Sequence, residues 1–242
     1  MLSGAGPMVA AANPIADQFA KDGYVGPFTL GSIGQMRFVA YALSQTVFNR
    51  TGPVPDDPFV NRHLDSPVVE QLCSHPAIFS KIEQLLGHDL VVWRSLFFSK
   101  GPGSKDIAWH QDGYFWKLDP SVTITAWLAI DRAHVSDHCM QVVPGSHTMS
   151  LPHMDSEPAS QFPKSAEIGQ AVLAHAIDLP VEAGMFILFD QRLLHRSRPG
   201  GSSRRLALSI RIAPASVRID NVLLPASGRV LSMRPKSAAG DR

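Results

Sequence analysis

"GMFILFDQRLLHRSRPGGSSRRLALSIRI", residues 184–212, is the stretch that decides the fold. Its two ends, residues 184–190 and 204–212, are short apolar runs with isoleucine or phenylalanine, and a turn rich in Pro, Gly and Ser lies between them. Runs of this length and composition, bounded by turn residues, are typical of β-strands. The stretch therefore predicts two strands whose connection shows no helical periodicity.

The same pattern recurs along the chain after Gly87. Five more runs meet the criteria for strands, namely residues 89–99, 107–112, 121–130, 139–143 and 176–181. Seven short strands with turn signals and no intervening helices favour an all-β barrel or jelly roll. Residues 148–170 have no clear periodicity, and a long insertion of this kind in a compact β domain is often a lid or a binding loop.

The N-terminal third has a different pattern, and residues 15–88 are predicted to be mainly helical. Residues 15–48 show apolar spacing typical of a helix. Two short helices are expected within residues 66–87, with Ser66 as an N-cap, Pro76 at the start of the second helix and Gly87 at its end. These helices would support the β core.

The composition is that of one sizeable globular domain. The chain has 242 residues, 45% of them hydrophobic. We therefore predict a single domain, residues 1–242, with a jelly-roll core at residues 89–213 and poorly ordered tails at residues 1–14 and about 226–242. The chain has a formal net charge of +1, which argues against a surface that binds nucleic acid or a membrane.

The location in the cell is suggested by three further features. Only Cys73 and Cys139 are present, without the spacing of a zinc site, which favours a reducing compartment. The N-terminus lacks the basic region of a signal peptide, and no apolar run reaches the roughly 18 residues of a membrane helix. A cytoplasmic protein without a membrane partner is expected, and its oligomeric state is open.

The motif "WHQDGYFW", residues 109–116, places a histidine and an aspartate in an aromatic setting. Residues i and i+2 of a strand project from the same face, so His110 and Asp112 are expected side by side while Gln111 points away. Alone, such a pair is more often structural than metal-binding. Its value depends on a third ligand elsewhere in the chain.

His195 is the best candidate for that third ligand, because it follows a buried-looking strand and precedes a turn. Two histidines and one carboxylate form the facial triad of non-haem Fe(II) oxygenases, which leaves coordination positions for substrate and oxygen. Nitrogen and oxygen donors without thiolates also fit ferrous iron better than a closed structural zinc site. A metal-binding, cupin-like protein without oxygenase activity is the alternative from another class.

Arg204 and Arg205 lie at the start of the last strand. Alternation places Arg205 on one face with Ala207, Ser209 and Arg211, and Arg204 on the other face, so one of the two arginines must point inward. A buried guanidinium needs a partner, and the distal carboxylate of a metal-bound α-keto acid would accept a bidentate, charge-assisted pair. The residues alone do not decide between the two arginines.

Five motifs in order resemble the phytanoyl-CoA dioxygenase family: "WRSLFFSKGPGS", "WHQDGYFW", "ITAWLAID", "MQVVPGSH" and "HRSRPGGSSRRLALSIR". The segment "NRHLDSPVVEQLCSHPAIFSKIEQLLG" is similar to its bacterial branch, which acts on amino acids and other small metabolites. The resemblance implies a double-stranded β-helix (jelly roll) with N-terminal and flanking helices. It also implies dependence on Fe(II), 2-oxoglutarate and O2, with release of succinate and CO2.

The resemblance assigns roles to individual residues. His110, Asp112 and His195 match the iron ligands, Arg205 matches the arginine that binds 2-oxoglutarate, and Ser197 matches the hydroxyl beside it. A second group falls where family members line the cosubstrate pocket: Lys100, Gln111 and Trp127. Gln111 would need a bend or bulge to reach that pocket, because simple alternation points it away. The family's usual Asn-Gly turn is replaced here by Asp137-His138, for which only a local change is expected.

Substrate contacts are less defined. Tyr114, Phe115 and Trp116 follow the metal strand and are predicted either to line a substrate pocket or to pack in the core. Arg94 and Arg62 are candidates to bind an anionic substrate, with a solvated surface position as the alternative for both.

The predicted reaction is hydroxylation of an unactivated C–H bond in a small metabolite, such as an amino-acid derivative or a natural-product intermediate. Desaturation or ring closure by the same type of site is an alternative. Related halogenases have Gly or Ala in place of the carboxylate ligand, so the presence of Asp112 favours a hydroxylase over a halogenase.

Overall fold

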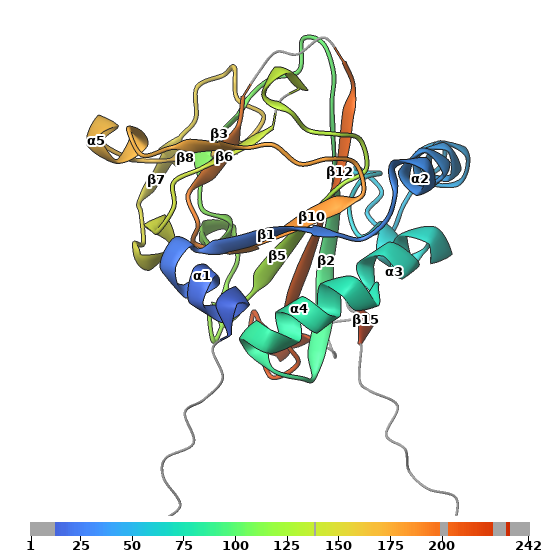
Figure 1. Cartoon of the computed structure of the whole chain (residues 1–242), viewed down its shortest axis with the longest axis horizontal. Coiled ribbons are helices and arrows are strands. Elements are labelled where there is room, and N and C mark those ends of the chain that lie inside the picture. The colour runs from blue at the N-terminus through green and yellow to red at the C-terminus, as the bar shows by residue number, and fades with distance from the viewer. Residues whose placement is uncertain (1–12, 138, 199–202, 225–230, 233–242) are drawn as a thin grey trace, which may run out of the picture.

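The computed structural model describes residues 13–137, 139–198, 203–224 and 231–232 (Figure 1). Most of the two expected tails, residues 1–14 and 226–242, lies outside the described residues, and so does His138 of the expected turn. Within the tails, Asn13 caps the first helix, α1 (Pro14–Asp22), by accepting a hydrogen bond from the Ala16 amide. Leu231–Ser232 forms a short strand, β15. The tail boundaries are corrected accordingly.

Two antiparallel sheets form the core, as the strand pattern predicts (Figure 1). The larger has six strands in the order β1-β10-β5-β12-β2-β15, and the smaller has four in the order β3-β11-β6-β9. The strands of the larger sheet are β1 (Tyr24–Thr29), β2 (Leu90–Lys100), β5 (Ile124–Ala129), β10 (Met185–Asp190), β12 (Arg205–Pro214) and β15. The smaller sheet contains β3 (Ile107–His110), β6 (Met140–Val142), β9 (Ile177–Leu179) and β11 (His195–Ser197). The predicted mainly β, jelly-roll fold is confirmed.

The helices and the remaining strands surround these two sheets. The helices are α1, α2 (Ile33–Thr46), α3 (Pro67–Cys73), α4 (Pro76–Leu86) and α5 (Gln170–Leu173), with the 3₁₀ turns η1 (Arg62–Leu64), η2 (Asp112–Phe115), η3 (Val135–Asp137) and η4 (Ser146–Thr148). Two small sheets contain β4 (Leu118–Asp119), β13 (Arg218–Ile219) and β14 (Val222–Leu223), and β7 (His153–Asp155) and β8 (Lys164–Ala166). No helix in the described part of the chain has the length and apolar character needed to span a membrane.

The larger sheet buries both faces, and alternation along its strands separates two apolar layers. One layer packs the outer face against α2, α3 and α4, which cover it in Figure 1, and it includes Leu206, Leu208 and Ile210 of β12. The other layer lies between the two sheets and includes Ala207 of β12 and Trp127 of β5. Because residues i and i+2 share a face, Arg205, Ser209 and Arg211 also point into the space between the sheets.

The prediction that residues 15–48 are mainly helical is wrong for residues 24–29. These residues form β1, which pairs antiparallel with β10. Gly23 ends α1 in the left-handed conformation (φ 77°), and the chain then extends along the open edge of β10. Gly26 and Pro27 within "YVGPFT" weaken the strand signal in the sequence, but an edge strand tolerates proline.

The insertion at residues 148–170 is more ordered than its sequence indicates, because it contains the β7–β8 hairpin. The prediction for residues 107–112 is also modified: β3 ends at His110, and Asp112 begins the 3₁₀ turn η2. Gln111 between them is extended (φ −113°, ψ 123°), so the alternation of side chains continues from His110 through Asp112. That residues 1–242 form one domain, with residues 15–88 supporting a core at 89–213, stays a prediction.

Candidate metal centre

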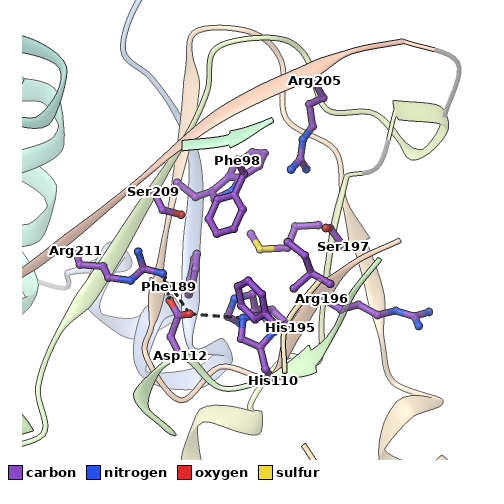
Figure 2. Close-up of a pocket in the computed structure, with 14 residues that line it drawn as sticks. Phe98, His110, Asp112, Phe189, His195, Arg196, Ser197, Arg205, Ser209 and Arg211 are labelled. Atoms are coloured by element: carbon purple, nitrogen blue, oxygen red, sulfur yellow. Dashed lines mark hydrogen bonds and ion pairs between the residues drawn. The ribbon is translucent and has the colours of Figure 1, made fainter. Parts of the chain in front are cut away.

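His110, Asp112 and His195 meet in the space between the two sheets (Figure 2). His110 ends β3 and His195 begins β11, and these strands pair so that the two histidines lie directly opposite each other. The candidate ligand atoms of the three residues all lie within 4.8 Å of one another, and all three side chains are buried. Two imidazoles and one carboxylate at this separation can hold one metal ion on a single face of its coordination sphere.

The hydrogen bonds of the two histidines fix which ring nitrogen faces the centre. His110 Nδ1 lies 2.8 Å from the Ala108 carbonyl, and His195 Nδ1 lies 2.9 Å from the Leu193 carbonyl. A carbonyl oxygen only accepts hydrogen bonds, so Nδ1 must carry the proton in both rings. Each Nε2 can therefore present a lone pair, and the hydrogen bond at Nδ1 fixes the orientation of the ring, an arrangement common at metal sites.

The protonation states also suit a cation. Burial and the nearby His110 lower the pKa of His195 to about 3, so this imidazole is neutral at physiological pH. Burial alone would raise the pKa of Asp112, but the charge of the nearby Arg211 holds it well below its usual range. Asp112 is therefore an anion, and Thr125 Oγ1 donates to its Oδ2 at 3.3 Å.

A second group of polar side chains lies in the same cavity, on the side where β12 begins (Figure 2). Arg205 is buried and its guanidinium lies 5.1 Å from the centre of the Trp127 ring. Burial lowers the pKa of Arg205 to about 10, so the side chain keeps its charge at neutral pH. The Ser197 hydroxyl lines the cavity and has no hydrogen-bond partner among the described residues. Arg204 is instead half-exposed and pairs with Asp131 at 3.7 Å.

Lys100 lies next to this group but does not line the cavity. Its buried ammonium donates to the carbonyl oxygens of Lys105 at 2.9 Å and Ser197 at 3.4 Å. Burial and the charge of Arg205 lower the pKa of Lys100 to about 8. The side chain thus ties β2 to β11 behind the candidate cosubstrate pocket.

Gln111 does not line the cavity, and the structure corrects that expectation. Its amide nitrogen donates to the carbonyls of Met149 and Arg192, both at hydrogen-bond distance, and its amide oxygen accepts from the Leu151 amide at 3.0 Å. The side chain points away from the centre, as simple alternation predicts. Its hydrogen bonds hold the start of the 148–170 insertion next to the 3₁₀ turn η2.

The three aromatic residues after Asp112 separate into two groups. Tyr114 and Phe115 are partly exposed, and Tyr114 stacks on His153 of the hairpin with ring centres 4.1 Å apart. Trp116 packs edge-to-face on Trp93 and belongs to an apolar cluster at the end of the sheet. None of the three lines the cavity, so they form its surroundings and not its wall.

Arg62 is not a substrate residue, and the structure corrects this expectation as well. Its side chain is fully buried, forms an ion pair with Asp65 at 3.0 Å, and donates to the carbonyls of Val47 and Pro58. The guanidinium therefore holds together the end of α2 and the loop before η1. Arg94 is only partly buried and lies on β2 directly opposite Arg211.

We predict that an Arg62→Met variant is less stable than the wild type by about 3 kcal/mol, because it removes the buried charge partner of Asp65 and the hydrogen bonds to the carbonyls of Val47 and Pro58. The measurement is the free energy of unfolding in urea. Arg50→Gln is the matched control, since Arg50 pairs with the same Asp65 from an exposed position and is worth about 0.5 kcal/mol. Equal stability losses in the two variants would contradict the structural role of Arg62.

Sequence reasoning missed several residues that line the cavity. Arg211 was expected on the same strand face as Arg205 but received no role, although its Nη2 lies 3.4 and 3.3 Å from the two Asp112 carboxylate oxygens. Phe162, from the insertion, packs on His110 with ring centres 4.7 Å apart. Phe98 and Phe189 complete the apolar wall. Strand alternation could have pointed to Arg211, whereas nothing in the aperiodic insertion marks Phe162.

The chain is similar in sequence to known proteins. A family model described as "Phytanoyl-CoA dioxygenase (PhyH)" matches residues 36–206. A mouse protein, "Phytanoyl-CoA dioxygenase domain-containing protein 1", is 24% identical over 194 residues, and the match covers 74% of this chain and 66% of that protein. The chain thus spans about two thirds of this relative's length.

Two solved structures have the same fold. A non-haem monooxygenase, ThoJ in its apo form, superposes with a TM-score of 0.76 at 22% identity, covering 91% of this chain and 84% of ThoJ. CytC3 with Fe(II) and α-ketoglutarate gives a TM-score of 0.67 at 22% identity, covering 87% of this chain and 80% of CytC3.

Proposed function

Because the chain belongs to the phytanoyl-CoA dioxygenase family, we propose that it is an Fe(II)- and 2-oxoglutarate-dependent oxygenase that hydroxylates an unactivated C–H bond of a small metabolite. The observation that carries the proposal is the buried group of His110, Asp112 and His195 in one cavity with Arg205. Bound Fe(II), with 2-oxoglutarate and O2, supplies the oxidising chemistry and releases succinate and CO2.

The three proposed ligands fit ferrous iron in type, charge and orientation. Both imidazoles are oriented through Nδ1 and leave Nε2 for the metal. Asp112 is anionic and is held by Thr125 and Arg211, so little reorganisation accompanies metal binding. The donors are nitrogen and oxygen atoms, without the thiolates that favour structural zinc.

Arg205 and Ser197 fit the distal carboxylate of 2-oxoglutarate. A buried guanidinium binds a carboxylate strongly, and the Ser197 hydroxyl, which has no partner among the described residues, can donate a further hydrogen bond. The proximity of Trp127 restricts the position of the Arg205 side chain. Arg204 is a poor candidate for this role because it pairs with Asp131 outside the cavity.

A small substrate is favoured by the largely apolar lining of the cavity. Phe98, Phe162 and Phe189 exclude water from the side of the cavity near the two histidines. These residues would hold a target carbon close to the metal site in a dry environment, which is the main contribution of the protein to such a reaction.

Hydroxylation is favoured over halogenation by Asp112, because its carboxylate would serve as a metal ligand and leave no vacancy for chloride. Desaturation or ring closure by the same site remains the second candidate, distinguished by analysis of the product. A chlorinated product from the wild-type enzyme in the presence of chloride would contradict the proposal.

The test is succinate release from 2-oxoglutarate, measured with Fe(II) and O2 against a panel of amino acids, acyl groups and natural-product intermediates, each free or linked to a carrier. The proposal expects one class of compound to stimulate release and to gain one oxygen atom by mass spectrometry. If Fe(II) and 2-oxoglutarate bind but no compound gains oxygen, hydroxylation is rejected. If 2-oxoglutarate does not bind, the cupin-like alternative is favoured.

A further inference from the structure

Arg211 is a buried cation whose hydrogen-bonding capacity is only partly used. The residue is 3% exposed and lines the same cavity as the proposed metal ligands. Its Nη2 contacts Asp112, whereas its Nε and Nη1 have no hydrogen-bond partner among the described residues. Buried donors without partners are costly, so each one calls for an explanation such as a bound ligand.

The contact with Asp112 does not account for the whole guanidinium. If Arg211 served only to orient Asp112, the expected geometry would be a bidentate pair with two short parallel bonds. Here one nitrogen reaches both carboxylate oxygens at 3.3 and 3.4 Å. The guanidinium packs on the Trp116 ring, with its carbon 4.6 Å from the ring centre. Its Nε and Nη1 remain available to another hydrogen-bond acceptor.

The charges in the cavity also call for an anion. Among the residues that line it, Asp112 is the only acid, whereas Arg205 and Arg211 are both directed inward (Figure 2). The third arginine of the lining, Arg196, turns its guanidinium away toward Gln141 and Trp109. Bound Fe(II) and the 2-oxoglutarate dianion cancel each other, and Asp112 balances only one of the two arginines. Lys100 lies close to Arg205 and adds positive potential.

Arg94 adds a third arginine on the face of the larger sheet that carries Arg205 and Arg211. It lies on β2 directly opposite Arg211 of β12, so both side chains leave the sheet from the same face. Arg205 lies three alternate positions earlier on β12, so the proposed 2-oxoglutarate subsite and Arg211 lie at separate positions along the same face of the strand. The two arginine sites can therefore hold two different carboxylates.

We propose that Arg211 binds a carboxylate of the substrate, so that the substrate of this enzyme is a carboxylic acid whose acid group faces the Arg211 guanidinium while its apolar part faces the phenylalanine wall. This inference rests on the proposed function and narrows its substrate class. It assigns Arg211 a second role besides its contact with Asp112.

The experiment uses the full chain with Fe(II) and saturating 2-oxoglutarate, without oxygen, so that the Arg205 subsite is filled and no turnover occurs. Binding of acid–amide pairs of increasing size (acetate and acetamide, hexanoate and hexanamide, phenylacetate and phenylacetamide) is measured by calorimetry and by the change in the visible spectrum. The best acid is expected to bind at least about tenfold more tightly than its amide, since only the acid forms a charge-assisted pair.

Two variants test whether Arg211 is the cause of the preference for the acid over its amide. Arg211→Gln should remove the preference for acid, whereas Arg204→Gln, an exposed arginine on the same segment, should keep it. The Fe(II) affinity of each variant is measured separately, because Arg211 also contacts Asp112. The proposal is overturned if the wild type prefers none of the acids over its amide, if Arg211→Gln keeps the preference, or if the acids act by displacing 2-oxoglutarate.

These outcomes are distinct from failure of the proposed function. In that case the mixture of protein, Fe(II) and 2-oxoglutarate would already lack its visible absorption before any acid is added. The comparison of acids with amides in the wild type needs no variant, so the test holds even if Arg211→Gln folds poorly.

Discussion

An Asp112→Asn variant binds Fe(II) at least about 100-fold more weakly than the wild type and loses 2-oxoglutarate turnover to a similar degree. The amide keeps the shape of the side chain but removes the anion that balances the metal. It also leaves Arg211 without its carboxylate, and an uncompensated buried charge costs about 3–5 kcal/mol of stability in the metal-free protein. The measurements are an anaerobic Fe(II) titration and urea unfolding.

Asp155→Asn serves as the control for this prediction. Asp155 lies on β7, its side chain is 90% exposed, and its partner Lys164 is on the neighbouring strand. This variant should bind Fe(II) as the wild type does and unfold within about 0.5 kcal/mol of it. Wild-type Fe(II) affinity in Asp112→Asn would mean that the metal is held by other residues.

An Arg205→Gln variant raises the KM for 2-oxoglutarate by about 30- to 100-fold, the equivalent of about 2–3 kcal/mol for a buried charge-assisted pair. Fe(II) affinity should stay within about twofold, because Arg205 contacts none of the three proposed ligands through a described hydrogen bond. The measurement is succinate formation as a function of 2-oxoglutarate concentration.

Arg204→Gln is the matched comparison, because the two arginines are adjacent in sequence and point to opposite faces. Its KM for 2-oxoglutarate should stay within about twofold of the wild type, since Arg204 forms only a half-exposed pair with Asp131. A large effect in Arg204→Gln and none in Arg205→Gln would reverse the assignment.

The β core was predictable because its strands carry local signals. Apolar runs between turn residues located the seven predicted strands, and alternation correctly placed Arg205, Ala207, Ser209 and Arg211 on one face. The edge strand β1 was missed, since Gly26 and Pro27 suppress the strand pattern and the pairing with β10 is a long-range contact. Strand propensity is a property of the local sequence and cannot indicate such a long-range pairing.

For Gln111, the alternation of side chains along a strand predicted the correct direction of the side chain, whereas the family resemblance did not. The family comparison placed this residue in the cosubstrate pocket, whereas the period-two geometry pointed it away, and the structure agrees with the geometry. Arg62 was misjudged for a different reason. Its burial depends on carbonyls of Val47 and Pro58 that loops bring together, and no sequence pattern records that proximity.

The central claim is that His110, Asp112 and His195 would hold an Fe(II) ion to which 2-oxoglutarate binds as a chelating ligand. The most direct measurement is the visible spectrum of the anaerobic protein with Fe(II), before and after addition of 2-oxoglutarate. A weak metal-to-ligand charge-transfer band should appear in the wild type and be absent from a His195→Ala variant. A wild-type protein that binds Fe(II) but shows no such band with 2-oxoglutarate would contradict the claim.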